Sequence, residues 1–409
     1  MNATQPRWNV STVADVARLE MGQSPDGQAT NTNGKGTPLI GGAADYDDRG
    51  IEASRYTTQP TKICREGDLI LCIRATIGKV AVADKAYCLG RGVAGLRPSK
   101  VTSDFLRHFL NSQAKAMDEA GTGTTFRQID KKTLSSWPIP LPEPKEQDRI
   151  VAKLDSLLER SKNARKELAR ISGLVERYKQ AVLESAFNGR LTAHMREDHA
   201  ETCIDSIPKT WTWSRLGDLC EAIVDCPHST PEWTEHGEIC IRTTNFKPGM
   251  LDLTKVRYVS WETYHKRNAR LTPQVGDVVY SREGGILGIA CQIPDRVKLC
   301  LGQRMMLMRS NPSSYSSALL MYFLNSPSTL ATVRKMTGGT ASPHLNIGDV
   351  KNFRVPVPPL EEQVQIVTII QRLFTAADKT ELHRKKAANL IDRLDEATLA
   401  KAFRGELRV

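Results

Sequence analysis

The chain has 409 residues, 40% of them hydrophobic, which is enough for about two to four domains with apolar cores. Its formal net charge of +11 permits a polyanionic partner, but the excess of Lys and Arg is spread thinly and forms no basic tail. The N-terminus lacks the apolar core of a signal peptide, no apolar run reaches the roughly 20 residues that span a bilayer, and the nine cysteines form no C-x-x-C pair. These features exclude a membrane protein and a disulfide scaffold, so we expect a cytoplasmic protein.

The first 141 residues predict a mixed α/β domain. Short runs rich in Val, Ile and Leu, bounded by Gly, Pro and Asp, occur at 69–73, 79–83 and 93–98, as expected for strands. An amphipathic helix is expected over 103–117. Periodicity does not give the topology of this domain.

A long helix is predicted to follow. Pro142 and Pro144 suit the start of a helix, and residues 145–188 contain no further proline. At 1.5 Å per residue this helix would run roughly 65 Å. Nine of eleven positions spaced by fours and threes are apolar or aromatic, which indicates a heptad seam. The seam positions are Ile150, Leu154, Leu157, Ser161, Ala164, Leu168, Ile171, Val175, Tyr178, Val182 and Ser185.

The same organisation then occurs a second time. Residues 358–405 align with 142–189 without a gap, and the identical positions include the pairs Glu146/Glu362, Gln147/Gln363 and Phe187/Phe403. The preceding segments match more weakly: GDLILCIRATIGK at 67–79 lies over GDVVYSREGGILG at 276–288. Such a period indicates duplication of a whole domain. The second seam is less regular, and we place it on Ile366, Ile370, Leu373, Ala377, Ala387, Ile391 and Leu394.

We therefore predict an α+β fold in which two globular mixed α/β domains are separated by two long antiparallel helices, with an internal pseudo-two-fold repeat. The expected boundaries are 1–141 for the first domain, 142–204 for the first helix and linker, 205–357 for the second domain and 358–409 for the second helix. A helix of this length with one apolar face does not stand alone in water. Packing of the two helices on each other, with the domains at opposite ends of a rod, is preferred over two separate coiled-coil dimerisation arms.

Catalytic motifs are missing from the sequence. There is no G-x-x-x-x-G-K-[ST] phosphate loop and no Asn or Asp followed by Pro-Pro and an aromatic residue. No Ser/His/Asp or zinc-ligand spacing occurs, and His228, His236 and His344 stand alone. We expect a non-catalytic chain that binds no metal or cofactor.

Polar residues near the matched glycines are candidates for contact with double-stranded DNA, because Lys and Arg anchor phosphates while Arg, Gln and Asn read base edges. Arg74 and Arg282 are aligned as counterparts, and so are Arg127-Gln128 and Pro343-His344. The candidates are Arg74, Thr76, Lys79, Arg91, Thr124, Thr125, Arg127, Gln128 and Lys131 in the first domain, and Ser281, Arg282, Arg304, Thr340, Ser342, His344, Asn346 and Lys351 in the second.

Over essentially its whole length the chain resembles the specificity subunit of type I restriction–modification systems. The resemblance rests on the paired segments WPIPLPEPKEQDRIV and FRVPVPPLEEQVQIV, the two G-D-hydrophobic runs, and the endings AFNGRL and AFRGEL. It implies that each domain reads one half of a bipartite asymmetric DNA site and that the helices set the spacer. It also implies two modification subunits that methylate adenine N6 with S-adenosylmethionine, and restriction subunits that use ATP and Mg²⁺ in complexes that have them.

Two other functions stay open at this point. The chain is also compatible with a coiled-coil scaffold whose domains bind protein, although the Arg and Lys beside the strand turns argue against it. It is further compatible with the specificity portion of a self-contained methyltransferase, although the missing methyl-donor and base-extrusion motifs argue against that. The sequence does not identify the recognised bases or the spacer length.

Overall fold

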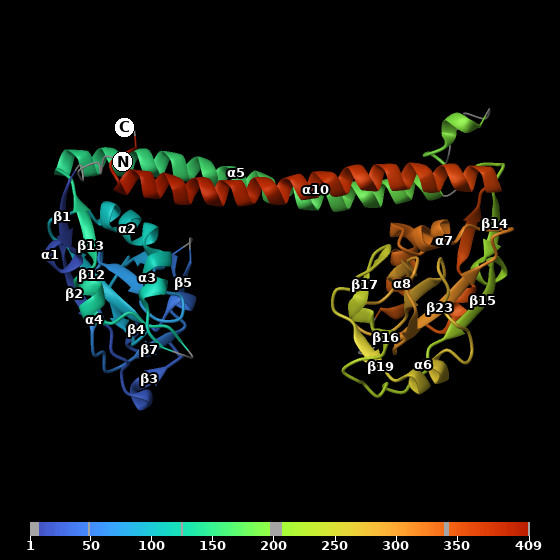
Figure 1. Cartoon of the computed structure of the whole chain (residues 1–409), viewed down its shortest axis with the longest axis horizontal. Helices are drawn as coiled ribbons and strands as arrows, with labels where there is room; N and C mark the ends of the chain where they lie inside the picture. The colour runs from blue at the N-terminus through green and yellow to red at the C-terminus, as the bar shows by residue number, and fades with distance from the viewer. Residues whose placement is uncertain (1–7, 48–49, 124–125, 197–206, 339–342, 408–409) are drawn as a thin grey trace. The chain divides into compact units, whose positions relative to one another are not determined.

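A computed structural model describes residues 8–47, 50–123, 126–196, 207–338 and 343–407. The chain divides into two compact units, residues 1–169 with 385–409 and residues 170–384. The division passes through two long helices, α5 (Pro144–Phe187) and α10 (Leu360–Phe403), each of 44 residues. Each unit therefore combines one globular domain with one half of each long helix (Figure 1).

The domain of the first unit is built on a four-stranded antiparallel sheet in the order β10-β9-β12-β2 and a five-stranded sheet in the order β3-β7-β4-β11-β8. Two short pairs, β1-β13 and β5-β6, complete it. The strands are β1 (Asn9–Thr12), β2 (Ala17–Met21), β3 (Thr30–Asn31), β4 (Thr37–Ile40), β5 (Tyr46–Asp47), β6 (Gly50–Ile51), β7 (Arg55–Thr57), β8 (Ile63–Cys64), β9 (Leu69–Cys72), β10 (Val80–Val82), β11 (Tyr87–Leu89), β12 (Val93–Pro98) and β13 (Pro138–Leu141). The helices are α1 (Val13–Val16), α2 (Ser103–Ser112), α3 (Ala114–Ala120) and α4 (Lys131–Ser135), with 3₁₀ turns at Gly27–Ala29 and Ala43–Asp45.

The domain of the second unit repeats this plan. Its four-stranded sheet has the order β15-β23-β20-β21, and its smaller sheets are β19-β16-β22, β14-β24 and β17-β18. The strands are β14 (Thr212–Arg215), β15 (Cys220–Asp225), β16 (Glu238–Ile241), β17 (Phe246–Lys247), β18 (Met250–Leu251), β19 (Arg257–Val259), β20 (Val278–Ser281), β21 (Ala290–Gln292), β22 (Leu299–Leu301), β23 (Met305–Ser310) and β24 (Arg354–Val357). The helices are α6 (Trp261–Arg267), α7 (Ser317–Leu324), α8 (Pro327–Thr337) and α9 (Ile347–Lys351), with 3₁₀ turns at Ala193–Met195, Leu216–Leu219 and Thr243–Asn245.

The continuous apolar runs of the sequence form the central strands of the four-stranded sheets. All four residues of β9, LILC, and of β20, VVYS, are buried, since each strand lies inside its sheet with covered faces. The proline-rich segments before the long helices are also strands: β13 pairs with β1 and β24 with β14, each in a two-stranded sheet that tolerates missing N–H groups. The predicted strands and the α+β class are confirmed.

Each long helix is fixed at its start to the domain that precedes it. Gln147 is buried, accepts the N–H of Thr102 at 2.9 Å and donates to the carbonyl of Pro142 at 3.0 Å. Gln363 makes the matching bonds in the second unit, to the N–H of Ser316 at 2.8 Å and the carbonyl of Pro358 at 2.9 Å. The identical glutamines of the repeat are thus buried anchors.

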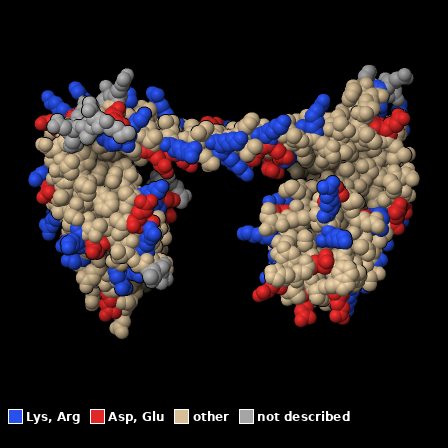
Figure 2. Space-filling model, in the orientation of Figure 1, with Lys and Arg blue, Asp and Glu red and all other residues tan. Residues whose placement is uncertain are grey.

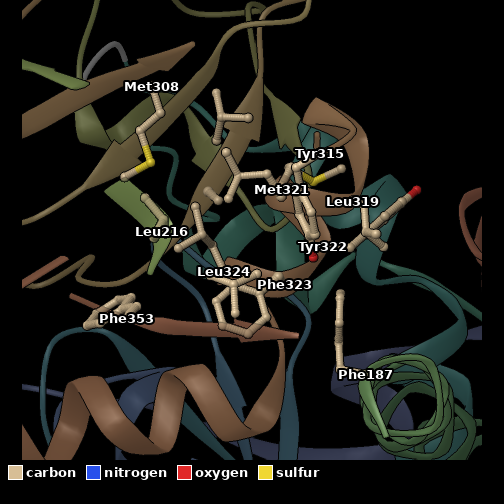
Figure 3. Close-up of a cluster of buried hydrophobic side chains, with 14 of the residues drawn as sticks. Phe187, Leu216, Met308, Tyr315, Leu319, Met321, Tyr322, Phe323, Leu324 and Phe353 are labelled. Carbon is tan, nitrogen blue, oxygen red and sulfur yellow. The ribbon is translucent and has the colours of Figure 1, made fainter. Parts of the chain in front are cut away.

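The end of each helix belongs to the other unit. Phe403, at the end of α10, packs edge-on against Phe105 and Phe109 of the first domain, with ring centroids 5.3 and 5.4 Å apart. Phe187, at the end of α5, packs against Phe323 in the core of the second domain at 5.5 Å (Figure 3). In each unit the beginning of one helix therefore lies beside the end of the other, so the predicted antiparallel packing is confirmed.

The seam between the helices follows most of the predicted heptad positions, which are buried or half-buried, but differs at Ala164, Tyr178 and Leu394. Arg165 lies in the seam in place of Ala164 and pairs with Asp392 and Asp395 at 2.9 and 2.6 Å, whereas Leu394 is 59% exposed. In the second unit Lys179 replaces the exposed Tyr178 and pairs with Asp378 at 2.5 Å. A straight helix drifts by about 20° per heptad from a strict 3.5-residue repeat, so the contacting position moves by one residue.

A buried carboxylate supports the second anchor. Glu362 accepts Trp211 Nε1 at 2.9 Å and Thr192 Oγ1 at 2.6 Å, and it also pairs with Arg196. The side chains of Arg196 and Glu362 are only 9% and 8% exposed. The matched carboxylate Glu146 accepts Trp8 Nε1 at 3.0 Å but is only half-buried.

Glu362→Ala is expected to destabilise the second unit by about 3–5 kcal/mol, because it leaves the buried Arg196 guanidinium without its counter-charge. The matched control Glu146→Ala removes a half-buried carboxylate and is expected to cost about 1–2 kcal/mol. Urea unfolding of the two variants measures the difference. Equal losses would contradict the role given to the buried ion pair.

Candidate nucleic-acid interface

Three loops of the first domain that are distant in the sequence meet beyond the end of β9. Ala75 N donates to Arg127 O at 3.0 Å, and Ile129 N donates to Ile73 O, also at 3.0 Å. Ile73 N in turn donates to Gly92 O at 2.9 Å. We call loops 73–76, 90–92 and 126–129 the first loop cluster.

The second domain holds its three matching loops in the same way. Gly284 N donates to Pro343 O at 3.3 Å, Leu345 N donates to Arg282 O at 2.9 Å, and Arg282 N donates to Arg304 O at 3.0 Å. We call loops 282–285, 302–304 and 343–346 the second loop cluster. In each domain, predicted contact residues that are about 50 to 60 positions apart in the sequence are thus brought together.

These contacts correct the pairing of Arg74 with Arg282 and agree with the alignment of 67–79 over 276–288, which places Arg74 over Glu283. Arg74 is bridged to Gln128 in the first cluster, and Glu283 is bridged to His344 in the second. The counterpart of Arg74 is therefore Glu283, and Arg282 matches the buried Ile73.

The clusters present most of the predicted residues to solvent. Thr76, Arg91 and Arg127 are exposed in the first, and Arg304, His344 and Asn346 in the second. Arg74 and Gln128 are half-buried. Lys131 and Lys351 are exposed on the short helices α4 and α9 that follow the clusters. Thr124, Thr125, Thr340 and Ser342 lie outside the described residues.

Three predicted contact residues have structural roles. Ser281 is fully buried, and its hydroxyl accepts Ile289 N at 2.9 Å. Arg282 is 6% exposed and pairs with Asp225. Lys79 Nζ donates to Ala43 O at 2.9 Å and lies over the Tyr46 ring, so it holds the 3₁₀ turn of the first domain. The sequence does not show which polar side chain of a strand-end turn makes such contacts within the domain, and DNA contact by these three residues stays a prediction.

The charges around α4 are mixed, so they favour an anionic ligand only in part. The N–H of Thr133 donates to Asp130 at 2.7 Å, which caps α4 and lowers the pKa of that carboxyl. Arg127 is itself paired with Asp118 at 3.4 Å. On the face shown in Figure 2, Lys and Arg lie among Asp and Glu in both units, as the thinly spread charge predicted.

Some residues beside the clusters were not predicted from the sequence. Phe126 is 57% exposed, and the Arg74 guanidinium lies 5.8 Å from its ring centroid. In the second domain the loop after β15 reaches its cluster, where Thr230 Oγ1 donates to Gln303 Oε1 at 3.4 Å and His228 lies 3.4 Å from Arg282. The sequence signal for Phe126 was an aromatic residue within a Gly- and Thr-rich loop. No sequence pattern indicated the loop after β15.

Both clusters contain a non-glycine residue in the left-handed region. Ala75 has φ 65° and Arg304 has φ 67°. Such a conformation costs on the order of 1 kcal/mol and is concentrated at functional sites. The two strained residues therefore lie in the same loops that carry the side chains predicted to contact DNA.

Comparison with known proteins identifies the family. The model of the type I restriction modification DNA specificity domain matches residues 6–172 and 208–390. The chain belongs to this family. The two matched segments each cover one globular domain and part of the helix after it, which agrees with the internal repeat.

Relatives span most of the chain. The chain is 24% identical to the type I restriction enzyme EcoDI specificity subunit of Escherichia coli, over 98% of its own length and 88% of that protein. It is 27% identical to the EcoBI specificity subunit of Escherichia coli, over 76% of its length and 67% of that protein. Among solved structures, the HsdS subunit from Thermoanaerobacter tengcongensis has a TM-score of 0.55 at 21% identity, covering 98% of both chains. A chain from a study of assembly and conformational transition of the type I R-M system has a TM-score of 0.73 at 21% identity and full coverage of both chains. These likenesses support the fold.

Within the described ranges the structure holds neither a cluster of metal ligands nor a membrane-spanning helix. No group of three or more His, Cys, Asp or Glu residues there is placed to hold a metal ion. No described helix combines the length and apolarity required to cross a membrane.

Arg304→Gly is expected to raise stability by about 1 kcal/mol, because glycine adopts positive φ without strain, and to weaken DNA binding. Loss of one phosphate contact lowers the salt slope of binding to a random-sequence duplex by about 0.9. Arg296→Gly is the matched control, since Arg296 has φ 59° and is 92% exposed outside the cluster. It should gain stability without any change in DNA binding. Equal DNA affinity of the two variants would show that Arg304 does not contact DNA.

Proposed function

We propose that this chain is the DNA specificity subunit of a type I restriction–modification complex. Each domain would read one half of a bipartite asymmetric site in double-stranded DNA, and the chain itself would carry no catalytic step. The observation that carries this proposal is the pair of loop clusters: the same backbone hydrogen bonds hold different side chains in the two domains. Two different half-sites require such a combination of one scaffold and two sets of contacts.

The helices suit the role of a spacer. Both continue from one unit into the other without interruption. The residue numbers of the pairs Arg165–Asp392 and Lys179–Asp378 add to the same total, so one antiparallel register serves both units. Since rigid elements set half-site spacing geometrically, the helix length would determine the unspecified spacer.

The helices also carry a repeated apolar surface that supports docking of two partners. Leu174 and Tyr178 on α5 are 54% and 45% exposed, and their counterparts at the 216-residue offset, Leu390 and Leu394 on α10, are 61% and 59% exposed. Contiguous exposed apolar surface marks sites of protein association, and the two side chains of each pair are four residues apart on one helix face. The first pair belongs to the second unit and the other pair to the first unit, so each unit offers one equivalent site.

We assign these two sites to two modification subunits, which would methylate adenine N6 with S-adenosylmethionine. Restriction subunits that use ATP and Mg²⁺ would join the complex through further contacts. The names of the family and of the relatives, which describe specificity subunits of type I restriction enzymes, support a place for this chain in such a complex.

Leu390→Glu with Leu394→Glu is expected to remove one of two modification subunits, because a charged side chain cannot be buried in an apolar interface without a large penalty. Leu174→Glu with Tyr178→Glu should remove the other. Native mass spectrometry of the purified complex measures the stoichiometry, and Lys386→Glu on the same helix is the control for added charge. Two bound subunits in both double variants would refute the assignment.

The proposed function itself is tested by lengthening both helices together. Seven residues inserted after Arg170 and seven after Lys386 preserve the helix pairing within each unit, because both sites lie at the division between the units. About 10 Å of added helix corresponds to roughly three base pairs of DNA. We expect methylome sequencing to show two unchanged half-sites with a longer spacer. Methylation with an unchanged spacer would exclude the helices as the spacer, and a motif without two halves in the wild type would exclude the proposed function.

A further inference from the structure

The two loop clusters differ most in chemistry at one equivalent pair of positions. The first cluster bridges Arg74 to Gln128, and the second bridges Glu283 to His344. The backbone hydrogen bonds around the pairs are the same, so the side chains occupy matching places in the two domains. The cation of the first domain is replaced by an anion in the second domain.

The carboxylate of Glu283 is held in place by a buried arginine. Arg282 Nη2 lies 2.9 Å from Glu283 Oε1, and the same guanidinium makes two bonds to Asp225, at 2.8 and 2.9 Å. Arg282 also donates to the carbonyl of Leu345 at 3.1 Å, which ties it to the loop of His344. Its side chain is 7% exposed, whereas that of Glu283 is 27% exposed.

The charges of this group do not balance. Two carboxylates, Asp225 and Glu283, share one guanidinium, so the group carries a net charge of about −1 when both are ionised and His228, which lies 3.0 Å from Asp225, is neutral. Asp225 is directed inward, with 13% of its side chain exposed. The surplus negative charge therefore lies at the exposed carboxylate of Glu283.

A fixed carboxylate in a DNA interface weakens binding to every sequence through repulsion by the phosphates. The cost is offset only where a hydrogen-bond donor meets it, and in the major groove the donors are the exocyclic amino groups of cytosine N4 and adenine N6. A group of this kind gives specificity by penalising the wrong base.

A neighbouring cation is available to offset the phosphates. Arg304 is exposed, and a Cβ at Gly284 would lie 3.3 Å from Arg304 Nη1, so the absence of a side chain at Gly284 lets the guanidinium lie close to this loop. Arg304 and Glu283 thus project from adjacent loops joined by the Arg282 N to Arg304 O hydrogen bond of 3.0 Å. Phosphate anchoring and base reading are assigned to separate side chains.

We propose that Glu283 is a specificity-determining residue of the second domain, and that its carboxylate, positioned by Arg282, accepts a hydrogen bond from the exocyclic amino group of a base in the second half-site. Arg74 occupies the equivalent place in the first domain, where a guanidinium pairs with the O6 and N7 acceptors of guanine. This inference rests on the proposed function and deepens it. It assigns opposite hydrogen-bonding chemistry to the two half-sites at the matched position.

The test is methylome sequencing of a host that carries the full chain with its modification subunits. Glu283→Gln removes the charge and adds a donor at nearly constant volume, so we expect discrimination to fall about tenfold or more at one position of the second half-site. The base at this position in the wild-type motif distinguishes cytosine from adenine. The control Glu221→Gln, at the other end of β15 from Asp225 and exposed, should leave the motif unchanged.

A second variant separates a reading defect from a folding defect. Glu283→Asp keeps the charge but withdraws the carboxylate by one methylene group, and we expect slower methylation of the original motif with no new base accepted. Arg74→Lys loses bidentate geometry and should relax one position of the first half-site only. Unchanged motifs in Glu283→Gln and Glu283→Asp, with normal methylation, would overturn the proposal while the proposed function stands. A wild-type complex with no bipartite motif would overturn the proposed function instead.

Discussion

Burial of both ends of the two long helices is the constraint on which the structure depends. A 44-residue helix with one apolar stripe is not held by its own hydrogen bonds in water. Here Gln147 and Gln363 bind each helix start to one domain, and Phe403 and Phe187 bury each helix end in a domain core. The duplicated segment requires two copies, because the end of each copy needs the domain that belongs to the other.

The repeat keeps the anchors and varies what lies between them. Beneath the helices of the first unit, buried His108 lies 2.7 Å from Asp155, and burial together with the Arg107 charge lowers the pKa of its imidazole. The matching position of the second unit is Tyr322, which packs edge-on against Phe374 at 5.7 Å. The two domains therefore rest on the helices through different chemistry while their backbone plan stays the same.

Most of the architecture could be predicted because it follows from patterns repeated along the chain. Apolar runs such as 69–73 became central strands, and the gap-free alignment of 142–189 with 358–405 gave the helices and their pairing. The seam could not be placed to the residue, since Arg165 and Lys179 contact acidic partners on a helix more than 190 residues away. In the loops, the inward or outward direction of Arg282 depends on Asp225, 57 positions earlier, and no local pattern reports that contact.

The buried ion pair between Arg282 and Asp225 explains why the two loop clusters differ in chemistry. In the first domain Ile73 is fully covered in the apolar core, whereas the second domain places Arg282 at the equivalent position and supplies Asp225 to neutralise it. Such a pair is weak as a source of stability, since desolvation offsets much of its attraction. It does hold a carboxylate at the tip of the loop in a fixed geometry, which an isoleucine cannot do. An ion pair beneath the loop of the second domain, at the place of the apolar Ile73 in the first, is thus the physical means by which the same scaffold presents an anion there.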